Sequence, residues 1–420
     1  MAERQALPTA VASGPARGWL PGLGGAALWT LAQHAAFFAC AWGVSWWAGA
    51  QRFGAFGQGL ALAAMLPAAV TLRLEYAGQL ERRPRRAQSL FGLAETGALT
   101  CSVLLVALLS LASLREDVPA WLWAASLAVL PQAGMLVLAS REARSGSTVL
   151  AAALRGAPAI VMAAVLALAW LLRLDEAIEW SIPLSAWLCW LPACAWLNAR
   201  CAGAPRKARA ARARLVAAKH WPFVRAELPA FMLNTSANHG QVLLIGLLAG
   251  DAMAGTAALA LRIAMLPTSV FGLAMADRLR ARVVAVGRGA MLLPMMRQSI
   301  RRMAGLSLAT HAVAALGALA LLPWVFPAQG PALVTVVLWL LPLGMVRFVA
   351  SPLAFLLPWR GWLGLSLLGQ CLLFACALLS VLAGFPLAGL DGVATVYAVS
   401  ASFVYLGYVY AALKAVRDDT

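Results

Sequence analysis

Charged residues are scarce in this sequence. Asp, Glu, Lys and Arg make up only 12% of its 420 residues, whereas 62% are hydrophobic, and the mean hydropathy is +0.80. Soluble globular domains average about 25% charged residues, so the composition excludes that class. Apolar runs of about 20 residues, long enough to cross a bilayer as helices, recur along the chain. The sequence therefore predicts an all-α, multi-pass membrane protein.

Common signatures of catalytic and metal sites are absent from the sequence. No two of the seven cysteines have C-x-x-C spacing, and most of them lie inside apolar runs, where they are typical of small apolar fillers. The sequence has no glycine-rich phosphate loop, and no carboxylate pair or Ser/His/Asp set converges. We therefore expect no enzymatic activity, no cofactor and no metal.

Acidic residues are about half as frequent as basic ones. The chain has 16 Asp and Glu against 33 Lys and Arg, which gives a net charge of +17. Such an excess could indicate nucleic-acid binding, but the basic residues form short clusters between apolar runs rather than one polar domain. That pattern is typical of membrane topology, and the clusters attract anionic membrane lipids. We expect no nucleic-acid partner.

The apolar runs predict twelve transmembrane helices. Their approximate ranges are 22–48, 54–76, 87–112, 118–140, 148–172, 178–199, 226–250, 252–280, 303–325, 331–357, 361–384 and 392–413. Most Lys and Arg residues fall in alternate connections, whereas the opposite connections hold only Arg52, Arg115 and Arg173. By the positive-inside rule, both chain ends are predicted to be cytoplasmic.

The longest and most basic connection divides the chain into two halves. We predict a cytoplasmic tail at 1–18, a six-helix bundle at 19–199, a basic cytoplasmic linker at 200–225, a second six-helix bundle at 226–414 and a cytoplasmic tail at 415–420. Two halves that both begin on the cytoplasmic side form a parallel repeat. The string AMLP occurs at 64–67 and again at 264–267, in the second predicted span of each half.

Polar residues interrupt the predicted span at 226–250. Asn234, Asn238 and Gln241 follow i, i+4, i+7 spacing, so on an α-helix they form one stripe, with His239 on its flank. Lipid tails offer no hydrogen-bond partners, so this stripe must face a protein interface or a wet cavity. We predict that these four residues line a cavity.

Arg262 lies near the middle of the next predicted span. Ten residues separate it from the start of that span, which corresponds to a depth of about 15 Å. A guanidinium at this depth suits a pyrophosphate, to which it donates several charge-assisted hydrogen bonds. The alternative is a structural arginine whose donors are satisfied by carbonyl groups near Pro267.

Other ionisable residues also fall inside predicted spans. Arg73, Arg155, Arg347 and His34 are candidate cavity residues, although the long side chains of Arg73 and Arg347 could instead reach the headgroups. Two carboxylates, Glu95 and Glu75, are candidates for ion coupling or for ion pairs. Glu95 could pair with Arg73 or Arg155, whereas Glu75, two residues from Arg73, is expected to point to another helix face.

Three strings resemble segments of the polysaccharide flippases. They are RFGAFGQGLALAAMLPAAVTLRLEYAGQL at 52–80, AGTAALALRIAMLP at 254–267 and VRFVASPLAFLL at 346–357, which resemble the first-to-second, eighth and tenth spans of that family. The resemblance covers roughly residues 20–410. It implies the multidrug/oligosaccharidyl-lipid/polysaccharide transporter superfamily, with two six-helix bundles around a central cavity and transport by alternating access.

The resemblance implies a flippase that moves an undecaprenyl-pyrophosphate-linked oligosaccharide from the inner to the outer leaflet of the bacterial inner membrane, for surface polysaccharide synthesis. Expected partners are this lipid-linked oligosaccharide, membrane lipids, and a polysaccharide polymerase with its chain-length machinery. A cation-coupled multidrug exporter of the same superfamily is the first alternative. It needs acidic residues in the cavity, and the spans contain more arginine than carboxylate. A glycan ligase or acyltransferase is the less favoured second alternative.

Overall fold

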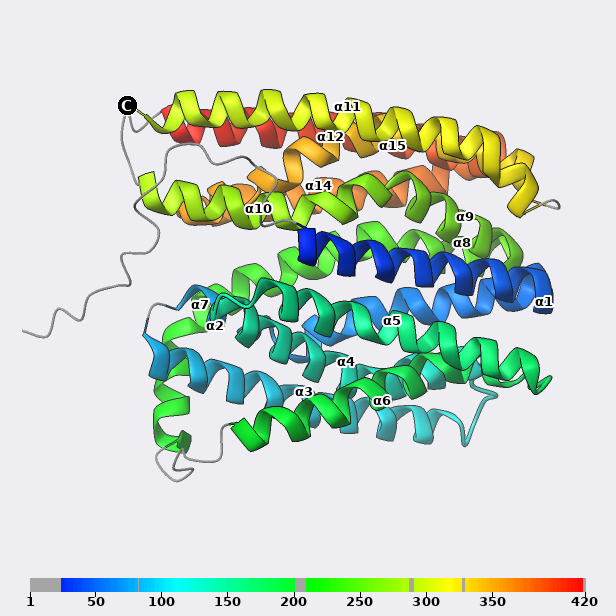
Figure 1. Ribbon diagram of the computed structural model, residues 1–420, viewed down its shortest axis with the longest axis horizontal. Coiled ribbons are helices and arrows are strands. Elements are labelled where there is room, and N and C mark those ends of the chain that lie inside the picture. The colour runs from blue at the N-terminus through cyan, green and yellow to red at the C-terminus, as the bar shows by residue number, and fades with distance from the viewer. Residues whose placement is uncertain (1–23, 82, 201–208, 287–290, 327–328, 418–420) are drawn as a thin grey trace, which may run out of the picture.

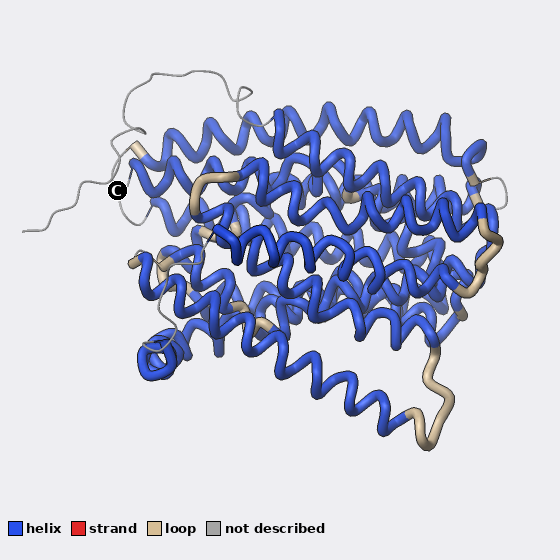
Figure 2. The backbone as a smooth tube through the Cα atoms, turned by 60° about the horizontal axis from the view of Figure 1, so that its bottom comes forward, coloured by secondary structure: helices blue, strands red, loops and turns tan. Residues whose placement is uncertain are grey.

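The computed structural model describes residues 24–81, 83–200, 209–286, 291–326 and 329–417. Within these ranges the backbone is almost entirely helical and contains no strand (Figure 2). The α-helices are α1 (Gly24–Val70), α2 (Leu74–Leu80), α3 (Pro84–Ala112), α4 (Ala120–Arg144), α5 (Thr148–Leu171), α6 (Ala177–Arg200), α7 (Arg209–Thr235), α8 (Gln241–Ala249), α9 (Asp251–Ala264), α10 (Leu266–Val286), α11 (Leu292–Val325), α12 (Gly330–Ala350), α13 (Leu356–Trp359), α14 (Leu363–Leu379) and α15 (Phe385–Arg417). The predicted all-α fold is confirmed.

The helices run roughly parallel to one long axis and form two groups (Figure 1). Helices α3 to α6 lie on one side and α10 to α15 on the other, while α1 lies between them and packs against α9. The first part of α7 and the end of α15 lie at one end of the molecule, with α2 and the basic residues Arg141 and Arg144; we call it the basic end.

Seven helical segments of the described chain are long and apolar enough to cross a membrane, and an eighth is added if the bent pair Asp251–Ala264 and Leu266–Gly272 forms one span. Each of the twelve predicted apolar runs overlaps a helix in the described residues. The protein is therefore a multi-pass membrane protein. Arg155 and Arg347 lie in two of the seven segments, whereas His34, Asn238 and His239 lie in helices outside them.

The two halves begin with the same kind of turn. Gly49 (φ 79°, ψ 175°) breaks α1 after the first predicted span, and Gly250 (φ 85°, ψ 168°) separates α8 from α9 at the equivalent place in the second half. Residues with a Cβ rarely adopt this backbone conformation, which explains the glycines. We call the end of the molecule that holds these two turns the turn end. Each predicted bundle thus has a glycine turn of the same geometry after its first span.

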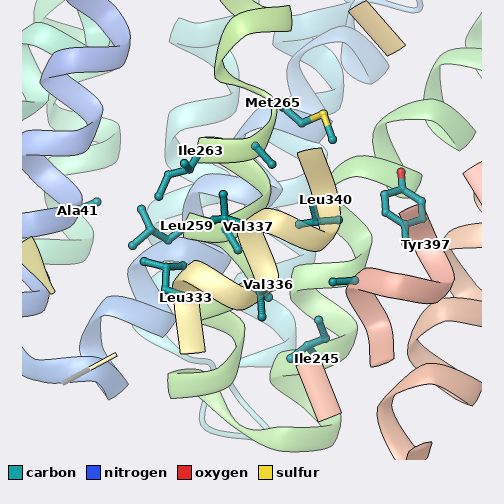
Figure 3. Packing of buried hydrophobic residues seen from close by; sticks show 14 of the residues in the cluster. Ala41, Ile245, Leu259, Ile263, Met265, Leu333, Val336, Val337, Leu340 and Tyr397 are labelled. Carbon is teal, nitrogen blue, oxygen red and sulfur yellow. The ribbon is translucent and has the colours of Figure 1, made fainter. Parts of the chain in front are cut away.

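Small and branched apolar side chains fill the largest core cluster (Figure 3). Leu259 and Ile263 of α9 pack beside Leu333 and Val337 of α12, with Ala41 of α1 on the opposite side. Lipid tails are as apolar as these side chains, so close packing rather than escape from water favours the helix contacts.

The backbone differs from a set of straight α-helices at two places that matter for the site. Leu72 and Arg73, with φ of 54° and 57°, break the predicted second span between α1 and α2. A π-helical turn at Ser236–Gly240 separates α7 from α8. The predicted linker at 200–225 also differs, because α7 begins at Arg209 and continues through it. The tail at 1–18 and residues 201–208 lie outside the described residues.

Candidate functional site

The two halves are in close contact at the turn end. A Cβ built on Gly54 would lie 1.8 Å from the backbone oxygen of Asp251, so only glycine allows this approach. The Gln58 side chain donates a hydrogen bond of 2.6 Å to Oδ1 of Asp251. Phe53 packs against Gly255. These contacts join the beginning of the second predicted span to the beginning of the eighth and close the turn end.

A cavity of about 650 Å³ lies between the halves, on the side of these contacts that faces the basic end. Seven of the residues singled out from the sequence line it: His34, Arg73, Arg155, Asn238, His239, Arg262 and Arg347. They come from α1, the α1–α2 break, α5, the π-turn, α9 and α12. No acidic residue is among the described residues of its lining. The charged groups of the cavity wall are therefore cationic.

Arg262 is held by an aromatic ring rather than by a carboxylate. Its Cζ lies 3.2 Å from the centroid of the Phe37 ring, a close cation–π contact that fixes the guanidinium against α1. Within the described part of the chain, the guanidinium makes no hydrogen bond and no salt bridge. Its donors are therefore available to a bound anion.

Arg347 is positioned by the π-turn. It donates a hydrogen bond of 2.5 Å to Oδ1 of Asn238, and Nδ2 of Asn238 donates to both the backbone oxygen and Oδ1 of Asn234, each at 2.7 Å. Asn234 does not line the cavity itself and acts through Asn238. Arg347 also lies 6.0 Å from the ring centroid of Tyr405.

Gln241 departs from the predicted stripe. It is buried and donates a hydrogen bond of 3.3 Å to Oγ of Ser380, which opens a second π-turn at Ser380–Gly384. A π-turn inserts one residue, and each residue advances an α-helix by about 100°, so Gln241 is rotated away from the side that Asn234 and Asn238 share. Tyr397 donates to the backbone oxygen of Ala237, a carbonyl group within the π-turn.

Arg73 and Glu75 form a pair that the sequence spacing did not predict. Nη1 of Arg73 lies 3.3 Å from Oε1 of Glu75, because the left-handed residues Leu72 and Arg73 turn the two side chains toward each other. Glu75 is 1% exposed, and Thr71 donates to its other oxygen at 2.6 Å. The Arg73 guanidinium also lies 4.4 Å from the ring centroid of Phe231 on α7, across the two halves.

Glu95 lies away from the cavity. Its carboxylate pairs with Arg141 at 2.7 Å, not with Arg73 or Arg155, and its side chain is 46% exposed. Spacing did not reveal this pair because α3 and α4 are antiparallel neighbours whose register only the packing sets. Among the described residues, no three His, Cys, Asp or Glu side chains come close enough to hold a metal ion.

Sequence reasoning did not identify the aromatic side chains that hold the arginines. Phe37 faces Arg262, and Tyr76 and Phe231 flank Arg73. Each looks like an ordinary apolar residue of a membrane span. The one available signal was their occurrence in segments that also carry polar residues, and that signal does not specify a contact.

No protein-family model and no curated protein matches the sequence. The fold is similar to solved structures of MATE transporters. A mutant form of the MATE transporter VcmN from Vibrio cholerae is 14% identical, with 94% of this chain and 99% of that chain covered and a TM-score of 0.60. An inward-facing multidrug resistance MATE family transporter of the MOP superfamily is 13% identical, with 94% and 96% covered and a TM-score of 0.58. The MATE multidrug transporter DinF-BH is 14% identical, with 94% and 93% covered and a TM-score of 0.55. The chain thus has the MATE transporter fold, around a cavity whose charged residues are basic.

Proposed function

We propose that this protein is a transporter of the MOP superfamily that moves a lipid-linked, pyrophosphate-bearing oligosaccharide across the membrane. One observation carries the proposal: four arginines, Arg73, Arg155, Arg262 and Arg347, line the cavity between the halves, and no acidic residue is among its described lining. Such a cavity attracts anions and repels cations, since charges interact strongly where water is limited. A pyrophosphate is an anion that guanidinium groups bind well.

Arg262 is the residue we assign to the pyrophosphate. Its position in the sequence is near the middle of a predicted membrane span, and its hydrogen-bond donors have no partner among the described residues. Holding a bare guanidinium at that depth costs at least about 2.5 kcal/mol. A bound anion offsets that cost, which supports a role in cargo binding.

The closed turn end supports alternating access. The Gly54–Asp251 and Gln58–Asp251 contacts hold the halves together at the turn end, so we expect cargo to enter the cavity from the side of the basic end. The positive-inside rule predicts that this end is cytoplasmic, so the conformation is the one that loads cargo from the inner leaflet. The lipid-linked oligosaccharide would then be released at the outer leaflet for surface polysaccharide synthesis.

The test is complementation of a strain that lacks the protein. We expect the deletion to cause lipid-linked repeat units to accumulate on the inner leaflet. In the deletion strain, the Arg262→Gln variant should support an export rate at least about tenfold lower than the unaltered chain does, since a charge-assisted bond contributes about 1.5–3 kcal/mol. Arg297→Gln is the matched control, because it removes the same charge from an exposed position on α11 outside the cavity. Normal export from the deletion strain, with no intermediate, would contradict the proposal.

A second candidate is a multidrug exporter, because two of the transporters with this fold are multidrug transporters. Export of cationic drugs requires a cavity that attracts cations, and the described lining here offers arginines instead. Overexpression should therefore leave susceptibility to cationic dyes and drugs unchanged. A clear rise in resistance, lost on substitution of a cavity residue, would favour this candidate over the flippase.

A further inference from the structure

A second cavity, of about 370 Å³, lies at the basic end and shares no residue with the central cavity. It is bounded by the end of α2, the beginning of α3 and the middle of α7. Its described lining consists of Ala77, Glu81, Arg83, Arg86, Lys219, His220 and Phe223. Three of these side chains are Lys or Arg and one is acidic, so the cavity has an excess of positive charge.

In the wall formed by α2 and α3, Arg144 engages the backbone carbonyl groups that end α2. Arg144 donates hydrogen bonds to the backbone oxygens of Gly78 and Gln79, at 3.3 and 3.4 Å, and also to that of Glu81. These are the carbonyl groups at the end of α2, whose partial negative charge Arg144 offsets. Arg83 caps the beginning of α3, so the partial positive charge of that helix end adjoins the cavity.

The one carboxylate in the described lining of this cavity is already engaged within the protein. Glu81 accepts a hydrogen bond of 3.0 Å from the Arg83 amide, and its other oxygen lies 3.2 Å from Nε2 of His220. Partial burial raises the pKa of the Glu81 carboxyl, but the Arg83 amide, the His220 ring and the charge of Arg86 outweigh this and leave it below its usual value. The side chains of Arg83, Arg86 and Lys219 form no salt bridge in the described part of the chain.

We propose that this cavity binds the phosphate group of an anionic membrane lipid. The cations supply the recognition of phosphate, and Ala77 and Phe223 supply apolar wall for the part of the lipid next to it. Trp221, 53% exposed beside His220, has the character of a residue at the membrane interface. The volume exceeds that of a phosphate alone, which favours a lipid headgroup over a free ion.

A lipid bound here would connect the two halves at the basic end, because α2 and α3 belong to the first predicted bundle, and Lys219 and His220 lie on α7, which continues into the second. It would also lie close to the central cavity, since Arg73 precedes Ala77 by one helical turn. Two sources share the required chemistry, an anionic phospholipid and a polyprenyl phosphate. The site does not depend on the transport function proposed above.

The experiment uses the purified full chain in detergent and measures retained lipid by native mass spectrometry. With phosphatidylglycerol added, we expect the unaltered protein to retain the lipid and the double variant Arg86→Gln/Lys219→Gln to bind it at least tenfold more weakly. The double variant Arg297→Gln/Lys414→Gln removes the same charge from exposed positions outside the cavity and should bind normally. Phosphatidylcholine has no net charge, so the unaltered protein and the control variant should both retain much less of it than of phosphatidylglycerol.

Equal retention of phosphatidylglycerol by the cavity variant and the control variant would overturn the proposal. Competition with undecaprenyl phosphate identifies the source of the lipid phosphate. If undecaprenyl phosphate displaces phosphatidylglycerol at a concentration below that of the phospholipid, the site binds a polyprenyl phosphate; if it does not displace it, the site binds a phospholipid. Both outcomes support a lipid-phosphate site. Arg262→Gln should leave this binding unchanged, so the result is independent of cargo transport. If the double variant unfolds at a lower temperature, the single variant Lys219→Gln, which changes one exposed side chain, gives the answer.

Discussion

Arg73 shows how a single residue depends on its backbone. Leu72 and Arg73 both have left-handed backbone angles, which cost about 1–2 kcal/mol for each residue that is not glycine. The bonds from Thr71 and Arg73 to Glu75 offset this cost and direct the guanidinium toward the cavity. Glu75 is thus a positioning residue for Arg73.

Glu75→Gln should therefore lower stability. The substitution leaves the Arg73 guanidinium without its carboxylate in a partly buried place, at an expected cost of about 1–3 kcal/mol. Thermal unfolding in detergent measures the effect. Glu95→Gln is the control, since its pair with Arg141 is exposed and contributes at most about 1 kcal/mol. An equal fall in the unfolding temperature of the two variants would show that Glu75 has no special structural role.

At the scale of helices, breaks rather than regular segments create the site. The π-turn at Ser236–Gly240 turns Asn238 toward Arg347 and Gln241 toward Ser380. The glycine turns at Gly49 and Gly250 bring the second and eighth predicted spans together at the turn end. An unbroken α-helix at Ser236–Gly240 would instead keep Gln241 on the side that Asn234 and Asn238 share.

Gly54→Ala should separate the halves at the turn end. The added Cβ would lie 1.8 Å from the backbone oxygen of Asp251, so the two helices must move apart. Spin labels at the exposed positions Gln51 and Ala252, in a background without the native cysteines, report the distance between them. We expect a shift to longer distances.

Gly57→Ala is the matched control for this experiment, because its Cβ would meet only the Cβ of Ala258, at 3.7 Å. It should keep the distance distribution of the unaltered protein. A Gly54→Ala variant with that same distribution would show that the contact with Asp251 does not hold the turn end closed.

At the scale of the whole molecule, charge is unevenly distributed between the two ends. Arg83, Arg141, Arg144 and Lys414 belong to the basic end, whereas the α3–α4 connection at the other end contains Arg115 beside Glu116 and Asp117. The orientation predicted from this asymmetry has the closed turn end outside and the second cavity, proposed to bind lipid, on the cytoplasmic side.

Reporter fusions test this orientation. Alkaline phosphatase, which is active only outside the cytoplasm, should be active when fused after Glu116 and inactive when fused at Thr420. A green fluorescent protein fusion at Thr420 should fluoresce. The reverse pattern would place the basic end outside the cytoplasm. The proposal that the cavity receives cargo from the inner leaflet would then be wrong.

Hydropathy and charge alone were sufficient to predict the all-α membrane fold, because a bilayer admits few backbone arrangements and each span must be apolar over a fixed length. They also drew attention to Arg262, Arg347 and Asn238, since polar groups are rare in such spans. Which partners those groups have was decided only by the tertiary structure. The π-turn displaces Gln241, and the left-handed break pairs Arg73 with Glu75. The register that pairs Glu95 with Arg141 depends on packing between two helices. Residue spacing cannot encode these contacts, because one irregular turn rotates every residue that follows it.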